Sequence, residues 1–455
     1  MMRVLEFLVA LLIVAGLGAI AGIASPGSGH IDRSLVIGKD LRQVYDVLDN
    51  YRRLPDFSVL REDDPRVQFK FAGKSYGPGA EVSWTSEDPK VGNGQLTIAS
   101  ATPDFDKIDD NTKDASIVWN LDNKWRGQDK HFTLDLERQG SRGQLTKVNW
   151  SYDVTYGWNL VNRFANLYIH GEPDELIQYG LANLQNVLAS VPNIDYSQLI
   201  PYIEQSQPVP VLMLATSSPR DSGIQGLDEV VAAAITELQA SAKKLNVSVT
   251  GPRILFTTNY GDQLYTFDVA LPISASSLNV GGNEVQLTAS TPVSADATGS
   301  AAATADAKDA LLKPGSLDRY GRLIIDSKVR AEMAFGSAVL KGVWNGTFAG
   351  VPQTRDMLKA YATTHGYKFD EVINRPYNIL VRPEVQSADG DITTYAQYAV
   401  YLPITDAPAQ TPEQEAGIPV PSLEAAAPAP AASAADAPAA ATSAAEPAEA
   451  ASVGQ

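Results

Sequence analysis

The chain has 455 residues, 44% of them hydrophobic, which is enough for two or three domains that each have their own core. Its formal net charge of −17 argues against nucleic acid as a partner, because phosphate backbones are bound by basic surfaces. The absence of cysteine excludes disulfides, thiolate metal ligands and cysteine nucleophiles. The four histidines form no ligand-spaced pair, so we expect neither a metal site nor a cofactor.

An uncharged apolar run opens the chain, from Phe7 to Ala24. Its length is close to the roughly 20 residues that a membrane-spanning helix needs, and Arg3 on its short N-terminal side favours a cytoplasmic N-terminus. We therefore predict that residues 1–25 form a single transmembrane helix in the inner (cytoplasmic) membrane, with the main part of the chain in the periplasm. The alternative is a signal peptide that is cleaved after Ala24 and releases the protein into the periplasm.

The pattern of residues 30–192 predicts a strand, a helix, a series of strands and a long helix. Apolar residues recur at helical spacing over residues 41–51, and Pro55 is expected to end that helix. Alternating strand patterns follow, with glycine-rich turns between them. The closing helix carries its apolar residues on one stripe, over residues 176–188.

This region resembles the START-like helix-grip (SRPBCC) superfamily, and is most similar to its membrane-anchored, polyketide-cyclase-like bacterial members. The resemblance is carried by the order of elements and by Ile31-Asp32-Arg33-Ser34, Phe71-Ala72-Gly73, Gly77-Pro78-Gly79-Ala80 and Thr146-Lys147-Val148-Asn149-Trp150. It implies an antiparallel sheet wrapped around the long C-terminal helix, with an apolar cavity between them. It also implies hydrophobic ligands such as lipids or polyketides and, in some members, a cyclisation reaction.

Aromatic residues on the predicted strands are the candidate ligand-binding residues of this cavity. They are Trp84, Trp119, Trp150 and Tyr152, with Phe132 in the same pattern. The alternative is that these side chains only fill the core, which is the usual role of inward-facing strand residues.

Two apolar segments, each predicted to be a strand, end in the same tripeptide, Leu-Pro-Ile, at Ile273 and at Ile404. Proline lacks the N–H that a central strand needs, so it marks a strand end or an edge. Each strand closes a strand-helix-strand-strand pattern, which predicts a tandem repeat of βαββ units at residues 208–275 and 328–405. We expect the two Leu-Pro-Ile strands to be the central strands of a pseudo-symmetric cleft, and residues 193–210 to be a linker.

The tandem unit, residues 208–405, resembles the effector-binding domain of the GyrI-like superfamily. The residues that carry the resemblance are Gly342-Val343-Trp344-Asn345-Gly346, Arg375-Pro376-Tyr377 and the two Leu-Pro-Ile endings. It implies a cleft between two halves that accepts planar or cationic apolar molecules, often through a buried acid in the last strands. Here Gln397 and Tyr398 stand where that acid is expected, so Asp268 and Glu332 are the candidate substitutes.

Four aromatic residues are expected to form a cage in that cleft, because cations and flat rings both favour aromatic faces. They are Trp344, Tyr377, Tyr395 and Tyr398.

Two stretches are rich in small and polar residues, 274–322 between the repeats and the Ala/Pro-rich tail 406–455. Such composition buries too little apolar area to offset chain entropy, so both are predicted to be disordered, apart from one possible strand at residues 284–288. The expected fold class is α+β.

No catalytic constellation emerges from the sequence. Gly73-Lys74-Ser75 resembles the end of a phosphate loop, but Gln68 stands where the spacing demands glycine. The leading hypothesis is a membrane-anchored extracytoplasmic protein that binds hydrophobic small molecules or lipids as a sensor or carrier. The alternatives are a cyclase-like or hydrolase-like enzyme acting on such a ligand, and an interaction module of the cell envelope.

Overall fold

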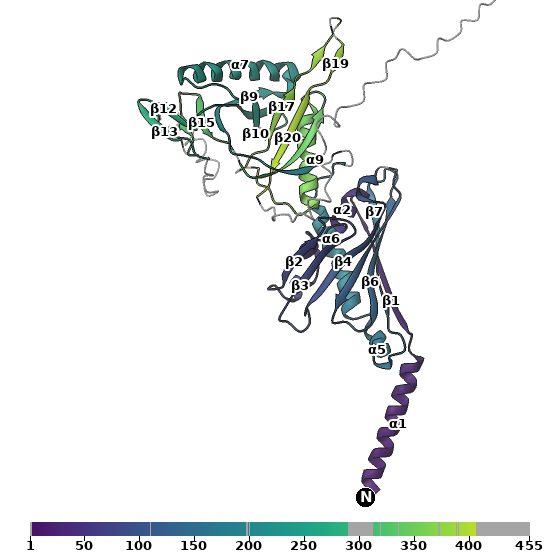
Figure 1. Ribbon diagram of the computed structural model, residues 1–455. Coiled ribbons are helices and arrows are strands. Elements are labelled where there is room, and N and C mark those ends of the chain that lie inside the picture. Colours follow the sequence, from purple (N-terminus) through teal and green to yellow (C-terminus); the bar gives the residue numbers. More distant parts are fainter. Residues whose placement is uncertain are drawn as a thin grey trace, which may run out of the picture.

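The computed structural model describes residues 2–405, apart from residues 110, 197, 198, 200, 290–312, 319, 335, 372, 373, 388 and 390. The tail 406–455 and the centre of the 274–322 stretch, both predicted to be disordered, lie outside the described residues. In the described part, an N-terminal helix is followed by a seven-stranded and then a nine-stranded sheet, each with its own helices (Figure 1). The predicted α+β class is confirmed.

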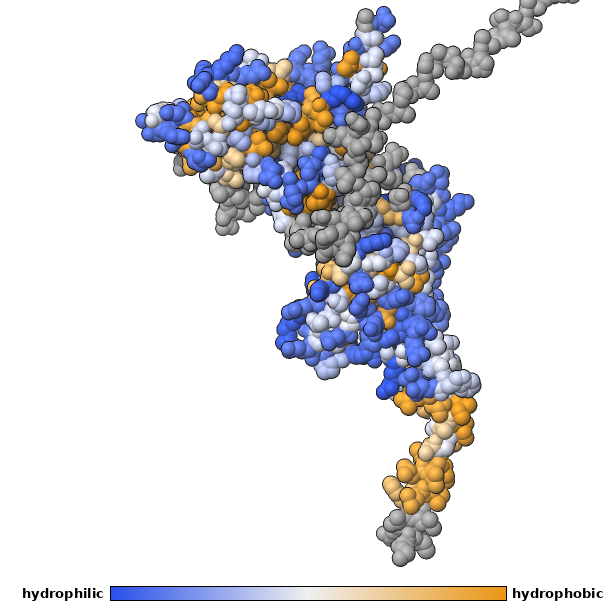
Figure 2. All heavy atoms as spheres, in the orientation of Figure 1, coloured by the Kyte–Doolittle hydropathy of each residue, from blue (hydrophilic) through white to orange (hydrophobic). Residues whose placement is uncertain are grey.

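Helix α1 (Met2–Ala24) projects away from the first sheet, and its apolar side chains from Phe7 onward are exposed (Figures 1 and 2). Among the described helices, α1 is long and apolar enough to cross a membrane, over the 18 residues from Phe7 to Ala24. A signal sequence near an N-terminus has the same character, so this helix fits both predictions for the segment.

The first sheet is an antiparallel meander in which the first strand returns to pair with the last, in the order β1-β7-β6-β5-β4-β3-β2. Helix α6 (Glu172–Ala189) packs against it (Figure 1). This is the arrangement that the helix-grip resemblance implies. The strands are β1 (Ser28–Ile37), β2 (Gln68–Gly73), β3 (Ala80–Thr85), β4 (Gly94–Thr102), β5 (Asp114–Asn123), β6 (Gln128–Gln139) and β7 (Leu145–Thr155).

The periodicity of the sequence explains why these elements pack as they do. In β5, alternate side chains from Ala115 to Leu121 are buried, as a sheet with one face on the core requires. In α6, one stripe of residues faces the sheet, and Gly180 lies where the helix meets Trp150. A Cβ at this glycine would be 3.1 Å from the indole ring, so the small residue permits the close approach.

The helix that follows β1 is shorter than predicted. Helix α2 (Leu41–Leu48) begins at Asp40, whose side chain accepts a hydrogen bond from the backbone N–H of Arg42. The prediction that Pro55 ends this helix is wrong. Pro55 stands in the first turn of a second helix, α3 (Leu54–Phe57), where its missing N–H costs no hydrogen bond.

Two short helices follow β7, and the first of them contacts the C-terminal end of α1. They are α5 (Leu160–Phe164) and the 3₁₀ helix η2 (Ala165–Tyr168), and Figure 1 shows α5 beside the junction of α1 with the sheet. The Arg163 guanidinium donates to the carbonyl oxygens of Ile23 and Ser25, at 3.1 and 3.3 Å. The end of α1 is therefore fixed to the first sheet domain.

The second sheet has the order β14-β15-β9-β11-β10-β17-β20-β16-β8, and every pairing is antiparallel. Helices α7 (Gly223–Lys244) and α9 (Gly350–Thr364) both cover the face that carries Leu212 and Leu340. The opposite face carries Met213 and Val339. The strands are β8 (Tyr202–Gln205), β9 (Pro210–Pro219), β10 (Ile254–Tyr260), β11 (Leu264–Pro272), β14 (Leu323–Ile324), β15 (Val329–Met333), β16 (Ala338–Asn345), β17 (Tyr377–Arg382) and β20 (Gln397–Pro403).

The strand order corrects two expectations. The two Leu-Pro-Ile strands, β11 and β20, each lie in the middle of their own half, whereas β10 and β17 pair with each other at the centre. The stretch predicted as a linker contributes β8, which pairs with β16 at the edge of the sheet. The stretch 274–322 begins with a hairpin of β12 (Ser277–Val280) and β13 (Asn283–Gln286), and β13 overlaps the one strand predicted there, at residues 284–288. A second small hairpin joins β18 (Val385–Gln386) and β19 (Ile392–Thr394).

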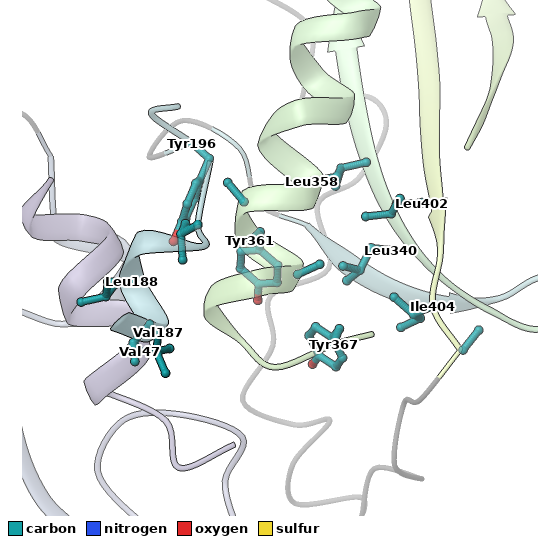
Figure 3. Close-up of a cluster of buried hydrophobic side chains, with 14 of the residues drawn as sticks. Val47, Val187, Leu188, Tyr196, Leu340, Leu358, Tyr361, Tyr367, Leu402 and Ile404 are labelled. Atoms are coloured by element: carbon teal, nitrogen blue, oxygen red, sulfur yellow. The ribbon is translucent and has the colours of Figure 1, made fainter. Parts of the chain in front are cut away.

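The two sheet domains meet at a buried contact between α2 and α9. Figure 3 shows Tyr196 lying between Leu188 of α6 and Tyr361 of α9, and the Tyr196 and Tyr361 rings are 6.0 Å apart. Polar contacts accompany the apolar ones: the Arg53 guanidinium donates to the Thr363 carbonyl oxygen at 2.7 Å. The apolar core is continuous across this contact, which joins the two domains.

Candidate functional site

A cavity of about 180 Å³ lies in the first domain between the sheet, the short helices α3 and α4 (Leu60–Asp63), and the N-terminal half of α6. Its wall combines the strand aromatics with aliphatic residues from the helices. The principal wall residues are Leu54, Trp84, Leu96, Trp119, Phe132 and Trp150. The helix-grip resemblance implied an apolar cavity at this place.

Three of the predicted ligand residues line this cavity together. Trp84 of β3, Trp119 of β5 and Trp150 of β7 come from three strands, and their exposed fractions are 5%, 0% and 2%. The Trp119 and Trp150 rings meet edge to face at 5.6 Å, and Phe132 meets Trp150 at 5.8 Å. Strand alternation places all of them on the face that looks toward α6.

The indole nitrogens of these tryptophans lack hydrogen bonds. Among the described residues, no acceptor pairs with Nε1 of Trp84, Trp119 or Trp150. The Tyr51 hydroxyl, whose ring packs on Trp119 at 5.3 Å, is also buried without a partner in the described chain. Each of these atoms has less than 1 Å² of accessible surface, so they are enclosed in the ring packing behind the cavity wall.

Tyr152, the fourth candidate of this domain, is buried but stands outside the cavity wall. Its ring packs against Phe132 at 5.3 Å and against Trp125 at 5.5 Å, and burial raises the pKa of its hydroxyl. For Tyr152 the core-filling alternative describes its position, because it supports two rings that do line the cavity.

The ionisable residues of the cavity lie at its exposed rim. Glu62 and Asp63 of α4, Glu172 and Glu175 of α6, and Lys90 form this rim. Lys90 pairs with Asp63 at 2.8 Å, and the Trp125 indole donates to Glu172 at 2.8 Å. Four carboxylates against one ammonium give the rim a negative charge.

The sequence did not predict which residues form the rim of the cavity and the part of its wall that comes from helices. Glu62 and Asp63 belong to α4, and Trp125 lies in a turn between two strands. These residues reach the cavity through long-range packing rather than local periodicity, so the sequence carried no signal for them.

The four aromatic residues predicted to form a cage in the second domain do not come together. Trp344 and Tyr398 are cross-strand partners on the helix-covered face. Tyr377 lies on the opposite face, where its ring stacks on Tyr401 at 4.6 Å. Tyr395 precedes β20 and is 39% exposed.

The candidate acids of the second domain lie on the face that α7 and α9 leave uncovered, and Asp268 already has cationic partners. Its carboxylate accepts a hydrogen bond from Arg375 at 2.8 Å, and the Arg322 guanidinium is 3.7 Å away. Burial opposes ionisation of Arg322, but Asp318, Asp268 and Glu332 together raise its pKa. Asp268 and Glu332 therefore belong to a buried ionic cluster, and Asp268 is not a free carboxylate for a cationic ligand.

Comparison with known proteins gives the chain no family. No family model matches it, and no curated protein matches it. Among solved structures, XoxI from Bacillus cereus is 16% identical with a TM-score of 0.25, covering 36% of this chain and 96% of that one. Norcoclaurine synthase from Thalictrum flavum is 8% identical with a TM-score of 0.27, covering 38% and 91%. A hydrolase from Listeria innocua is 13% identical with a TM-score of 0.26, covering 45% and 91%. The description of the site rests on this chain's own strand order and packing.

Proposed function

We propose that this chain is a membrane-anchored extracytoplasmic protein that binds a hydrophobic small molecule in the cavity of its first domain, as a carrier or sensor. The observation that carries the proposal is the cavity of about 180 Å³ with its wall of aromatic and aliphatic side chains. The apolar helix α1 supports the anchor. The second domain, which we infer to be a tandem repeat of βαββ units of the GyrI-like kind, then holds a fixed position on the binding domain.

The enzyme hypothesis has less support. Cyclase-like or hydrolase-like chemistry needs a general acid or base within hydrogen-bond reach of the reacting atoms. The ionisable residues among those that line the cavity, such as Glu175 and Lys90, are exposed at the rim. The interaction-module hypothesis, which expects closed and fully packed interiors, is disfavoured by the cavity itself.

Organic extraction of the purified full chain, followed by mass spectrometry, tests the proposal. We expect a small apolar compound to co-purify with the wild type and to be lost from Leu121→Trp, because Leu121 lines the cavity and the larger ring fills it. Val36→Trp adds the same ring on the exposed side of β1, at a position 44% exposed, and should retain the compound. An extract that is the same for all three proteins, or that contains only bulk membrane lipid, would refute the proposal.

A further inference from the structure

Large apolar side chains are exposed beside the end of α1. They belong to the segment of residues 158–168, which contains α5 and η2. The exposed fractions are 86% for Trp158, 58% for Val161, 68% for Leu167 and 75% for Tyr168. A single exposed apolar side chain is ordinary on a protein surface, but four large ones in one short segment indicate a surface that contacts a partner.

The 158–168 segment packs directly on the last turns of α1. A Cβ at Gly22 would lie 3.2 Å from Leu160 and 3.2 Å from Phe164, so the glycine permits α5 to approach the helix closely. Figure 1 shows α5 at this junction, on the side of the first domain where α1 leaves it. The exposed side chains of the segment therefore lie near the end of α1.

Arg163 holds this junction together. Its guanidinium donates to the Gly157 carbonyl oxygen at 2.7 Å as well as to the carbonyl oxygens of Ile23 and Ser25. The same guanidinium lies 4.8 Å from the centre of the Trp158 ring. One side chain thus connects α1, the start of the 158–168 segment and its most exposed ring, so the position of the segment relative to α1 is defined.

The length of α1 sets the level of the segment in a bilayer. The 18 residues from Phe7 to Ala24 extend over about 27 Å as a helix. This length is close to the roughly 30 Å of hydrocarbon in a typical bilayer. Gly22 lies within about 3 Å of the end of the apolar stretch. The residues that pack on Gly22 are therefore at the border between hydrocarbon and headgroups.

The charge of the segment also fits a lipid surface. The chain as a whole has a net charge of −17, yet residues 154–171 contain no Asp or Glu. Carboxylates return on both sides of this stretch, at Asp153 and Glu172. The titratable side chains inside it are Arg163 and His170. Because anionic lipids give membrane surfaces a negative potential, a stretch without carboxylates can approach them without repulsion.

We infer that residues 158–168 insert into the headgroup region of the bilayer that α1 spans. Trp and Tyr are enriched at this level of membranes, because their rings are apolar at one end and polar at the other. Trp158 and Tyr168 supply such rings, and Val161 and Leu167 add apolar surface that leaves water on insertion. The inference rests on the proposed anchor and adds a second membrane contact, which fixes the orientation of the first domain on the bilayer.

Quenching by lipids with brominated acyl chains tests this contact in nanodiscs that contain the full chain. Lipids brominated near the headgroup end of the chain should quench part of the tryptophan fluorescence, and more strongly than lipids brominated near the methyl end. We expect Trp158→Phe to remove more than half of the quenched component. Trp344→Phe, in the second domain, should leave that component unchanged.

A pair of matched carboxylate variants tests the same contact without removing the tryptophan. Val161→Glu places a charge where we expect lipid, and should reduce the quenching of Trp158 by about twofold or more, because burying a charge is unfavourable. Val36→Glu places the same charge at the end of β1 that is remote from α1, at a position 44% exposed, and should leave the quenching unchanged. Both positions are exposed, so both variants should fold.

The absence of native cysteine allows a further measurement, since a spin label at an introduced cysteine reports one position only. Oxygen partitions into lipid, whereas a charge-neutral nickel chelate stays in water. The ratio of oxygen to nickel accessibility should be higher for a label at Val161→Cys than for one at Val36→Cys.

The outcomes separate this inference from the anchor on which it rests. Quenching that survives Trp158→Phe, or equal accessibility ratios at positions 161 and 36, would overturn the inference and leave the anchor standing. Two chains in each disc without quenching of Trp158 would assign the surface to a second copy instead. Protein that does not remain with the discs would refute the anchor and the inference together.

Discussion

Replacing Asp46 by asparagine should lower the free energy of unfolding by about 3–5 kcal/mol, because it leaves a buried guanidinium without its carboxylate. Arg42 and Asp46 lie one turn apart on α2, with Nε and Oδ1 2.9 Å apart and side chains 5% and 0% exposed. Burial raises the pKa of Asp46, and Arg42 and the Tyr196 hydroxyl oppose that rise. Removing one member of such a pair costs more than the pair itself contributes.

Urea unfolding of the full chain in detergent micelles measures this loss. Glu237→Gln is the matched control, because it removes one charge from an ion pair at the surface. Glu237 Oε1 and Lys328 Nζ are 2.9 Å apart, and their side chains are 47% and 64% exposed. This variant should lose less than about 1 kcal/mol of unfolding free energy. The double variant Arg42→Met with Asp46→Leu should be more stable than Asp46→Asn, because it leaves no uncompensated charge. A loss below about 1 kcal/mol for Asp46→Asn would contradict the buried pair.

The same pair links the two domains. The Tyr196 hydroxyl donates to Asp46 at 2.8 Å and lies 3.0 Å from the Thr364 hydroxyl of α9. The Arg42 guanidinium donates to the Phe105 carbonyl oxygen at 2.6 Å and covers the Phe105 ring, which in turn meets His365. Because these groups are buried and connected, disruption at Asp46 should also weaken the attachment of the second domain.

Local periodicity made much of this fold predictable. The seven strands of the first sheet and helix α6 follow from alternation and from a single apolar stripe, and the tryptophans of the cavity follow from the same alternation. Strand β8 has only four residues, between segments that contain prolines, so its pairing with β16 was not recognised. Pro55 was misread because a proline permits the first turn of a helix as readily as it ends one.

The predicted cage failed because it depended on strand register. Tyr398 pairs with Leu380 across β17 and β20, and Leu380 is three residues from Tyr377. An odd separation along a strand puts two side chains on opposite faces, so Tyr377 and Tyr398 cannot share a site. Register is set by long-range pairing, which a single sequence does not report. The same limit applies to the network around Asp46, whose members are far apart in the chain.

The pH dependence of stability should depend on His365, the histidine of this junction. It is fully buried, its ring stacks on Tyr361 at 3.8 Å, and burial lowers its pKa from about 6.5 to about 3. Below pH 6.5 the unfolded chain binds a proton at this residue, while the folded chain stays unprotonated until about pH 3. The stability that His365 contributes is therefore complete above pH 6.5 and is lost as the pH falls, by about 2 kcal/mol at pH 5.

His365→Phe keeps a ring on Tyr361 but cannot titrate, so it should lack this loss. Burial raises the pKa values of the carboxyls Asp46 and Asp49, so their protonation on acidification favours the folded state, and both remain in the variant. The difference between the two proteins in unfolding free energy, measured at pH 7.5 and pH 5, therefore isolates the histidine. We expect the variant to gain about 2 kcal/mol relative to the wild type on acidification. A difference that does not change with pH would mean that His365 has the same pKa in the folded and unfolded chain, which would contradict its burial at the contact between α2 and α9.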